Sequence, residues 1–223
     1  MNQYIGHYSQ CYGIEEHRLV GGKGDGMRLL VINNGSGLEA TISLDRNADI
    51  SRLRYKGMNM SYFSPCGYVA PAYYESKGAD WLKSFTAGFL TTCGLQAVGS
   101  PCTDEGEELP LHGSIANTPT EYSFWYEEDG YLIVKARTSD ETIFGRKLCL
   151  CRTYTFPIGR MSTFSDTIKN TGDKKEPFEI LYHMNMGYPL LDEDSVVKIE
   201  SEEVTPRNKH AAEDIKNWMN MEN

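Results

Sequence analysis

Apolar and polar residues alternate with a period of two along much of this chain. Every second position is apolar in GLEATISLDR (residues 37–46), and a similar pattern returns in KLCLCRTYTF (147–156). Strands with one buried face have this period, because successive side chains point to opposite sides of a sheet. The two predicted buried faces consist of Leu38, Ala40, Ile42 and Leu44, and of Leu148, Leu150, Tyr154 and Phe156.

Turn residues separate these runs and indicate antiparallel pairing. FWYEEDGYLIVKAR (124–137) divides at the Asp-Gly step of residues 129–130, which tolerates the positive φ angles of a tight hairpin turn. FPIGRM (156–161) also has the composition of a turn, and two further strands are predicted around the Asn-Thr-Gly turn at residues 170–172.

Helical patterns are few. Residues 79–90 (ADWLKSFTAGFL) predict a short helix with Asp80 near its start and Trp81 and Phe85 one turn apart, and residues 208–223 are compatible with a second helix. The most economical fold is therefore mainly β, a sandwich of antiparallel strands that forms a single domain over residues 1–223.

The last residues raise a separate expectation. The chain ends at NWMNMEN, with no closing strand after the helix-compatible segment. We therefore expect a fragment whose last sheet lacks strands. An exposed sheet edge favours pairing with another chain, so a homo-oligomer is one expected partner state.

Composition and charge exclude several classes of function. The net charge is −9 and the pI about 5.1, which argues against nucleic acid because phosphate binding requires clustered Lys and Arg. The N-terminal residues lack a signal-peptide pattern, and no apolar stretch approaches the ~20 residues that span a bilayer. We expect a cytoplasmic protein with no membrane partner. None of the six cysteines lies in a CxxC pair, and no tightly spaced metal ligands are present, so no metal is expected.

Two histidines lie in segments that could carry chemistry. In EILYHMNMGYPLL (179–191), alternation places Glu179, His183 and Asn185 on one strand face, which is either solvated or lines a site. His112 directly precedes Gly113 in a polar loop. Imidazole transfers protons near neutral pH, whereas a single histidine on a strand is more often a surface or hydrogen-bonded residue. Spacing alone leaves both interpretations open.

Arg46 is a third candidate. If the strand over residues 38–44 continues, Arg46 falls on its inward face and needs a partner, for which Asp49 is suitable. Such a pair could simply stabilise a strand corner, or Arg46 could donate hydrogen bonds to sugar hydroxyls. Aromatic rings stack on the C–H faces of sugars, although most rings in a sandwich belong to the core. The aromatic candidates are Tyr73, Tyr74, Trp81 and Phe85.

Four segments in order carry a resemblance. With DRNADI (45–50), FTAGFLTTCGLQAVGSP (85–101), LPLHGSIANTP (109–119) and EILYHMNMGYPLL (179–191), the chain resembles the aldose 1-epimerase (galactose mutarotase-like) superfamily. The resemblance covers roughly residue 26 to the end and is closest to an aldose-epimerase-like branch without an assigned function. It implies a β-supersandwich that binds a monosaccharide or modified sugar on its concave face, without a metal or an organic cofactor.

The resemblance also implies roles for individual residues. In mutarotases a histidine protonates the ring oxygen, a carboxylate removes the proton from the C1 hydroxyl, and the ring opens, rotates and closes. By motif, His183 would be this general acid and His112 a second catalytic residue beside it. The residues implied to hold or orient the sugar are Arg46, Asp49, Trp81 and Asn185.

The carboxylate that acts as base in this superfamily lies in a C-terminal part that this sequence does not match. Glu202 and Glu203 occur too early in the order of motifs to replace it. The chain alone is therefore expected to show weak or no mutarotase activity. Two alternatives stay open: a sugar-binding or regulatory sandwich without the base, and a structural β-sandwich without a ligand.

Overall fold

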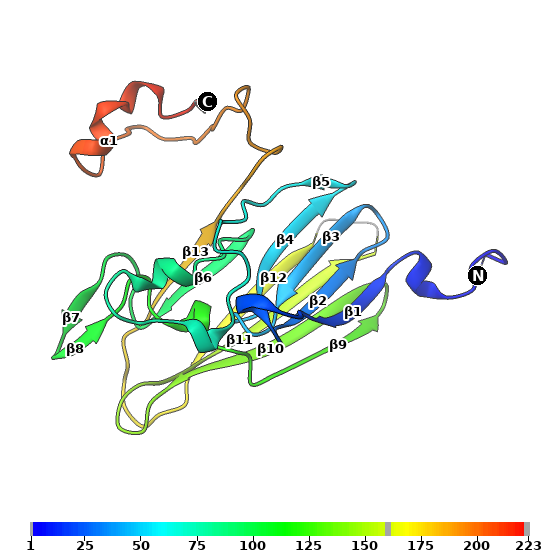
Figure 1. Cartoon of the computed structure of the whole chain (residues 1–223), viewed down its shortest axis with the longest axis horizontal. Coiled ribbons are helices and arrows are strands. Elements are labelled where there is room, and N and C mark those ends of the chain that lie inside the picture. Colours follow the sequence, from blue (N-terminus) through cyan, green and yellow to red (C-terminus); the bar gives the residue numbers. More distant parts are fainter. Residues whose placement is uncertain (1, 159–161, 221–223) are drawn as a thin grey trace.

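The computed structural model describes residues 2–158 and 162–220, and most of its elements are antiparallel strands (Figure 1). The strands are β1 (Gly13–Arg18), β2 (Arg28–Asn33), β3 (Leu38–Ser43), β4 (Asp49–Tyr55), β5 (Met58–Asn59), β6 (Leu90–Leu95), β7 (Cys102–Asp104), β8 (Glu107–Leu109), β9 (Tyr122–Glu128), β10 (Tyr131–Glu141), β11 (Lys147–Pro157), β12 (Thr163–Asn170) and β13 (Glu179–Met184). The helical elements are α1 (Lys209–Glu213) and the 3₁₀ turns η1 (Tyr8–Gln10), η2 (Gly22–Gly24), η3 (Pro71–Tyr73), η4 (Asp80–Ser84), η5 (Ile115–Asn117) and η6 (Ile215–Asn217).

Two antiparallel sheets enclose the main core. One has the order β1-β2-β3-β4-β5 and the other the order β12-β11-β10-β9. Their apolar faces meet in one cluster of buried residues, as the period of two predicts. The cluster draws on both predicted faces, including Ala40, Ile42, Leu44, Tyr154 and Phe156.

The predicted hairpin is confirmed. Tyr131 pairs with Glu128, so β9 and β10 are joined by the two residues Asp129 and Gly130. Both have positive φ angles, 51° and 78°, as a tight two-residue turn requires.

A further two-stranded sheet carries one of the histidines. In this sheet β13 pairs with β6, and a small β7-β8 hairpin lies nearby along the chain. Leu95 of β6 packs with Ile115, Leu148 and Leu150 in a second apolar cluster, against which Ile180 of β13 also lies. The β6-β13 pair is therefore attached to the inner face of the β9–β12 sheet.

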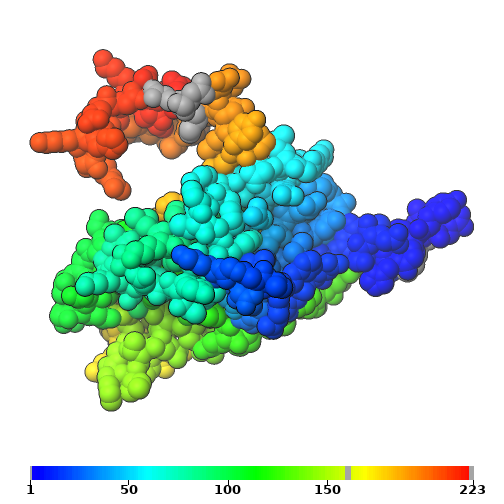
Figure 2. Space-filling model, in the orientation of Figure 1, coloured from blue at the N-terminus to red at the C-terminus, as the bar shows by residue number. Residues whose placement is uncertain are grey.

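Some local predictions differ from the structure. The short helix expected within residues 79–90 is the 3₁₀ element η4 with Asp80 at its start, and at Leu90 the strand β6 begins and pairs with β13. The turn predicted from FPIGRM falls partly on residues 159–161, outside the described residues. The helix near the C-terminus is confirmed as the single turn α1, in a segment that stands off the body of the molecule (Figures 1 and 2).

No helix in the described ranges is long and apolar enough to cross a membrane. The organisation of residues 1–223 as one domain stays a prediction.

Candidate functional site

His183 lies on the face of β13 that the alternation predicts. It is opposite Thr91 of β6, and its half-buried ring makes an edge-to-face contact with Phe85 at 5.5 Å between ring centroids. The neighbouring residue Tyr182 points the other way and contacts Phe164 of β12. One face of β13 therefore packs on the sandwich through Tyr182, and the opposite face carries the imidazole of His183.

The His112-Gly113 turn is held by backbone hydrogen bonds on both sides. The His112 N–H donates to the Gly99 carbonyl and the Gly94 N–H donates to the His112 carbonyl, each at 3.0 Å. His112 itself has φ 57°, a left-handed conformation that is uncommon outside glycine. A Cβ at Gly113 would collide with the carbonyls of Gly94 and Ala97, so this position requires glycine.

Four rings from three segments meet at the two histidines. The imidazoles of His112 and His183 lie 5.8 Å apart at 87°, edge to face. Trp81 lies 5.1 Å from His112 and stacks on Phe85 at 4.7 Å. The structure thus brings together three residues that the sequence predicts for a site, His112, His183 and Trp81, together with the aromatic candidate Phe85.

The hydrogen bond at Nδ1 defines the neutral form of His112. The Gly99 N–H donates to this nitrogen at 3.2 Å, so the proton of the neutral ring is on Nε2. Burial, and then the nearby charge of His183, lowers the pKa of His112. His112 is therefore suited to donate a hydrogen bond from a neutral ring rather than to act as a charged acid.

Carboxylates are not paired with these two histidines in the described residues, where the histidine–carboxylate contacts are His17–Glu15 and His210–Glu213. Glu179 shares the face of His183, but four residues along a strand separate them by about 13 Å. Its carboxylate instead accepts a hydrogen bond from the Val98 N–H at 2.9 Å. Glu179 thus secures the loop whose next amide, that of Gly99, contacts His112.

Arg46 is buried as predicted, but its partners differ from the prediction. β3 ends at Ser43, and Arg46 lies in the following turn. Its guanidinium donates to the carbonyls of Ala116 and Ser84 at 2.8 Å and of Val69 at 3.1 Å. The predicted ion pair with Asp49 is therefore wrong, since carbonyl oxygens satisfy this arginine instead. Burial lowers the pKa of Arg46 to about 10.

Asp49 binds a residue that the site predictions did not include. Its carboxylate accepts hydrogen bonds from Arg152 at 2.6 Å and from the Thr92 hydroxyl at 2.6 Å. Arg152 is the one charged residue on the inward face of β11, an anomaly in the alternation that could have indicated it. Asn185, also a predicted site residue, donates to the His183 carbonyl at 3.0 Å and so fixes the end of β13.

Three cavities lie away from the histidine pair. One of about 20 Å³ is lined by Arg46 and Asp49 and is too small for a sugar. One of about 600 Å³ has mainly apolar walls between the two sheets and opens beside Met184.

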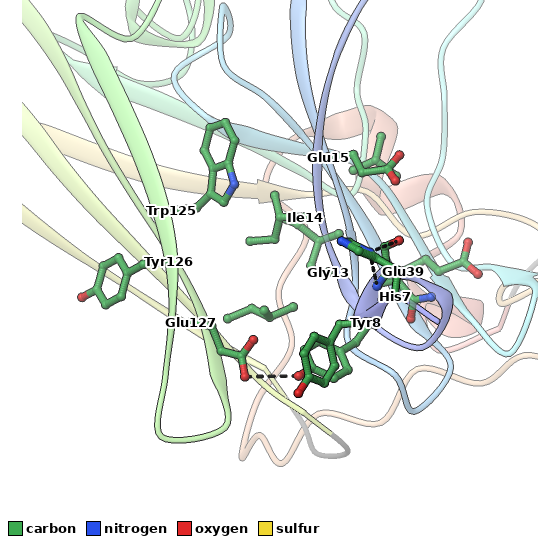
Figure 3. A pocket seen from close by; sticks show the side chains of 15 residues that line it. His7, Tyr8, Gly13, Ile14, Glu15, Glu39, Trp125, Tyr126 and Glu127 are labelled. Atoms are coloured by element: carbon green, nitrogen blue, oxygen red, sulfur yellow. Dashed lines mark hydrogen bonds between the residues drawn. The ribbon is translucent and has the colours of Figure 1, made fainter. Parts of the chain in front are cut away.

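A third cavity, of about 460 Å³, lies between β1 and β9 (Figure 3). Trp125 and Glu127 lie on one side of it, and Ile14 and Glu15 on the other. Ile14 is paired with the core residue Ile32 and points inward, whereas the next residue, Glu15, points outward. The cavity therefore extends over both faces of the edge strand β1. Its polar groups therefore do not converge on one point.

Comparisons with known proteins agree with this architecture. A structure from Klebsiella pneumoniae subsp. pneumoniae MGH 78578, described as "a putative aldose 1-epimerase", is 26% identical with a TM-score of 0.88; the match covers 96% of this chain and 59% of that chain. A galactose mutarotase-like protein from Clostridium acetobutylicum is 12% identical with a TM-score of 0.57, over 83% of this chain and 57% of that one. No curated protein matches the sequence.

These matches show the fold and the family separately. The antiparallel sheets have the galactose mutarotase-like fold, and this chain spans about 59% of the Klebsiella protein. A family model for a domain of unknown function matches residues 24–223, most of the sequence. The chain therefore belongs to the family described as domain of unknown function DUF4432.

Proposed function

We propose that this protein is a cytoplasmic aldose 1-epimerase that interconverts the anomers of a monosaccharide or modified sugar, with His183 as the general acid. The observation that carries the proposal is the pair of imidazoles at 5.8 Å, with His112 packed on Trp81 and His183 packed on Phe85. An imidazole can deliver a proton at neutral pH. Trp81 is 1% exposed, so it packs behind the histidines and does not present a face to a sugar as the sequence predicted. The fold shared with the Klebsiella protein supports the same chemistry.

The two histidines have different roles in the proposed reaction. His183 donates a proton to the ring oxygen as the C1–O5 bond breaks, and the C1 hydroxyl gives its proton to a base, which leaves an open-chain aldehyde. The aldehyde rotates about C1–C2, and the ring closes as both proton transfers are reversed. His112 donates an Nε2–H hydrogen bond to the sugar, since its Nδ1 is occupied by the Gly99 amide. Arg46 holds the Ala116 carbonyl, Asp49 accepts from the Thr92 amide of β6, and Asn185 fixes the strand end that carries His183.

A sugar-binding protein without catalysis is the second candidate. The C1 hydroxyl must lose its proton to a base on the side of the sugar away from His183. Glu179 is about 13 Å along β13 and its carboxylate holds the Val98 amide, so it is poorly placed for this step. Binding without anomer exchange would follow from the same ring cluster.

Anomer exchange measured by NMR over a panel of aldoses tests the proposal. We expect the wild type to exceed the uncatalysed rate for at least one sugar and His183→Gln to lose on the order of 100-fold in rate. His17→Gln is the matched control, because His17 is an exposed histidine paired only with Glu15. A wild type that accelerates no sugar would exclude the enzyme, and saturation-transfer NMR with the same sugars would then test binding alone.

A further inference from the structure

A buried arginine connects strands from all the layers around the histidine pair. Arg152 of β11 lies opposite Asp166 of β12 in the sheet register, and Thr92 of β6 lies opposite Tyr182 of β13. These two cross-strand pairs face each other, and Asp49 at the start of β4 joins them. Five strands therefore converge on one group of polar side chains inside the molecule.

The contacts of Arg152 are short and nearly complete. Its Nε and Nη2 donate to the two carboxylate oxygens of Asp166 at 2.8 and 2.6 Å, a bidentate arrangement. Nη1 donates to Asp49 at 2.6 Å, and Nη2 also donates to the Thr92 hydroxyl at 2.7 Å. The side chains of Arg152, Asp49 and Asp166 are 0%, 6% and 3% exposed, so water does not compete for these bonds.

The group extends to β13 through one hydroxyl. The Tyr182 O–H donates to the Asp166 carboxylate at 2.9 Å, and its ring packs edge to face on Phe164 at 5.4 Å. Neighbouring residues of a strand point to opposite faces, so a tether on Tyr182 fixes the direction in which His183 points. We propose that the Arg152–Asp166–Tyr182 group is a positioning device that holds β13, and with it His183, at its working distance from His112.

The geometry of the sheet makes this tether effective. β13 pairs with β6 along one edge, and Thr92 of β6 is itself bound to Asp49 and Arg152. Tyr182 thus adds an attachment on the face away from the imidazoles. Ile180 and Glu179 hold the first half of β13, so loss of the Tyr182 hydroxyl would release the end that carries His183, and the spacing of the two rings would loosen.

The inference deepens the proposed function for catalysis, but its first readout does not depend on activity. His183 contributes to lowering the pKa of His112, after burial. An NMR titration of the His112 ring therefore reports how close the two imidazoles stay. A purely structural role for Tyr182 would change stability and leave this titration unaltered.

The experiment compares Tyr182→Phe with Tyr12→Phe in the whole chain. Each substitution removes one hydroxyl that donates to a carboxylate, at 2.9 Å to Asp166 and at 3.2 Å to Glu127, and Tyr12 is remote from the histidines. Tyr182→Phe keeps the ion pairs of Arg152, so it should fold even where Asp166→Asn does not. His183→Ala gives the titration of His112 without its neighbour.

We expect the pKa of His112 to rise in Tyr182→Phe toward its value in His183→Ala and to stay unchanged in Tyr12→Phe. If the wild type exchanges anomers, kcat should fall about tenfold in Tyr182→Phe with KM little changed, since misplaced catalytic groups slow the chemical step. A folded Tyr182→Phe whose His112 titrates as in the wild type would overturn the positioning role. An inactive wild type would refute the proposed function and leave the titration as an independent test.

Discussion

Two buried arginines of this molecule are satisfied in opposite ways. Arg46 donates to three backbone carbonyls and has no ion pair among the described contacts. Arg152 is held by two buried carboxylates at 2.6 Å each. Burial lowers the pKa of Arg46 to about 10; for Arg152 burial acts in the same direction, but Tyr154, Asp166 and Asp49 outweigh it and raise the pKa.

The difference shows what each arginine does for the fold. The carbonyl partners of Arg46 lie outside the strands, in η4 (Ser84), in η5 (Ala116) and in the segment at Val69, so Arg46 fixes the backbone of these connecting segments. The carboxylate partners of Arg152 lie on strands, Asp49 on β4 and Asp166 on β12. Arg152 therefore links β11 to both strands through buried ion pairs. Removal of Arg46 leaves neutral dipoles without a donor, whereas removal of Arg152 leaves buried anions, which is costlier.

The largest expected effect follows from breaking the carboxylate-held arginine. Arg152→Met leaves Asp49 and Asp166 buried without their cation, and we expect a loss of about 3–5 kcal/mol in unfolding free energy. Urea denaturation followed by circular dichroism measures it. Arg146→Met is the control, because its Glu107 partner is 54% exposed and such pairs contribute about 1 kcal/mol or less. Equal losses in the two variants would contradict the comparison.

A smaller effect is expected for the carbonyl-held arginine. Arg46→Met removes the donor from three carbonyls but leaves no unpaired charge, so we expect a loss of about 2–3 kcal/mol in the same denaturation measurement. The ranking of the two arginines is the point of the test. A loss larger than that of Arg152→Met would reverse it.

The predictability of the fold differs between its local and long-range parts. The strands over residues 38–43 and 147–157 and the hairpin at Asp129-Gly130 could be predicted, because alternation and turn chemistry are local. The short helix expected within residues 79–90 occurs as the 3₁₀ element η4 and ends at Ser84, and the start of a strand at Leu90 was not predicted, because its partner β13 lies about ninety residues later. Pairing over that separation leaves no signal in the local pattern.

The site shows the same division. His112, His183 and Trp81 could be chosen from motifs, and they do meet in space. The partner of Arg46 was mispredicted, because β3 ends at Ser43 and the chain turns before Arg46. Arg152 was missed although it occupies an inward position between apolar residues, where a charge requires a buried counterion.

Asp140 extends the comparison to a buried carboxylate without a bound cation. Its Oδ1 accepts from the Gln96 amide at 2.9 Å, and its buried Oδ2 has no partner among the described atoms. Burial is the main cause that raises its pKa. The pKa of Asp140 is higher in the folded than in the unfolded protein. Its contribution to stability is therefore fully present below the unfolded-state pKa and is lost as the pH rises through the folded-state pKa. Asp140→Asn should therefore be more stable than the wild type at pH 7.

Denaturation across pH checks this sign. The advantage of Asp140→Asn should disappear near pH 3, where the wild-type carboxyl is protonated in both states. Asp49→Asn supplies the contrast. Burial raises the pKa of Asp49 as well, but this carboxylate is bound to the buried Arg152, so its substitution should destabilise the protein at pH 7. An Asp140→Asn variant less stable than the wild type at pH 7 would mean that this carboxylate has a cationic partner in solution.

The smallest expected effect concerns the imidazole pair, whose mutual electrostatic interaction is weaker than that of the buried ion pairs. His183→Gln removes the positive charge that contributes to the low pKa of His112, after burial, and keeps a polar side chain on β13. The pKa of His112 should rise but stay below its ordinary value, because burial and the Gly99 amide at Nδ1 remain. An NMR pH titration of the ring measures it, with His17→Gln as the distant control. An unchanged pKa of His112 would mean that the charge on one ring does not affect the other in solution. The different roles proposed for the two histidines would then not follow from their proximity.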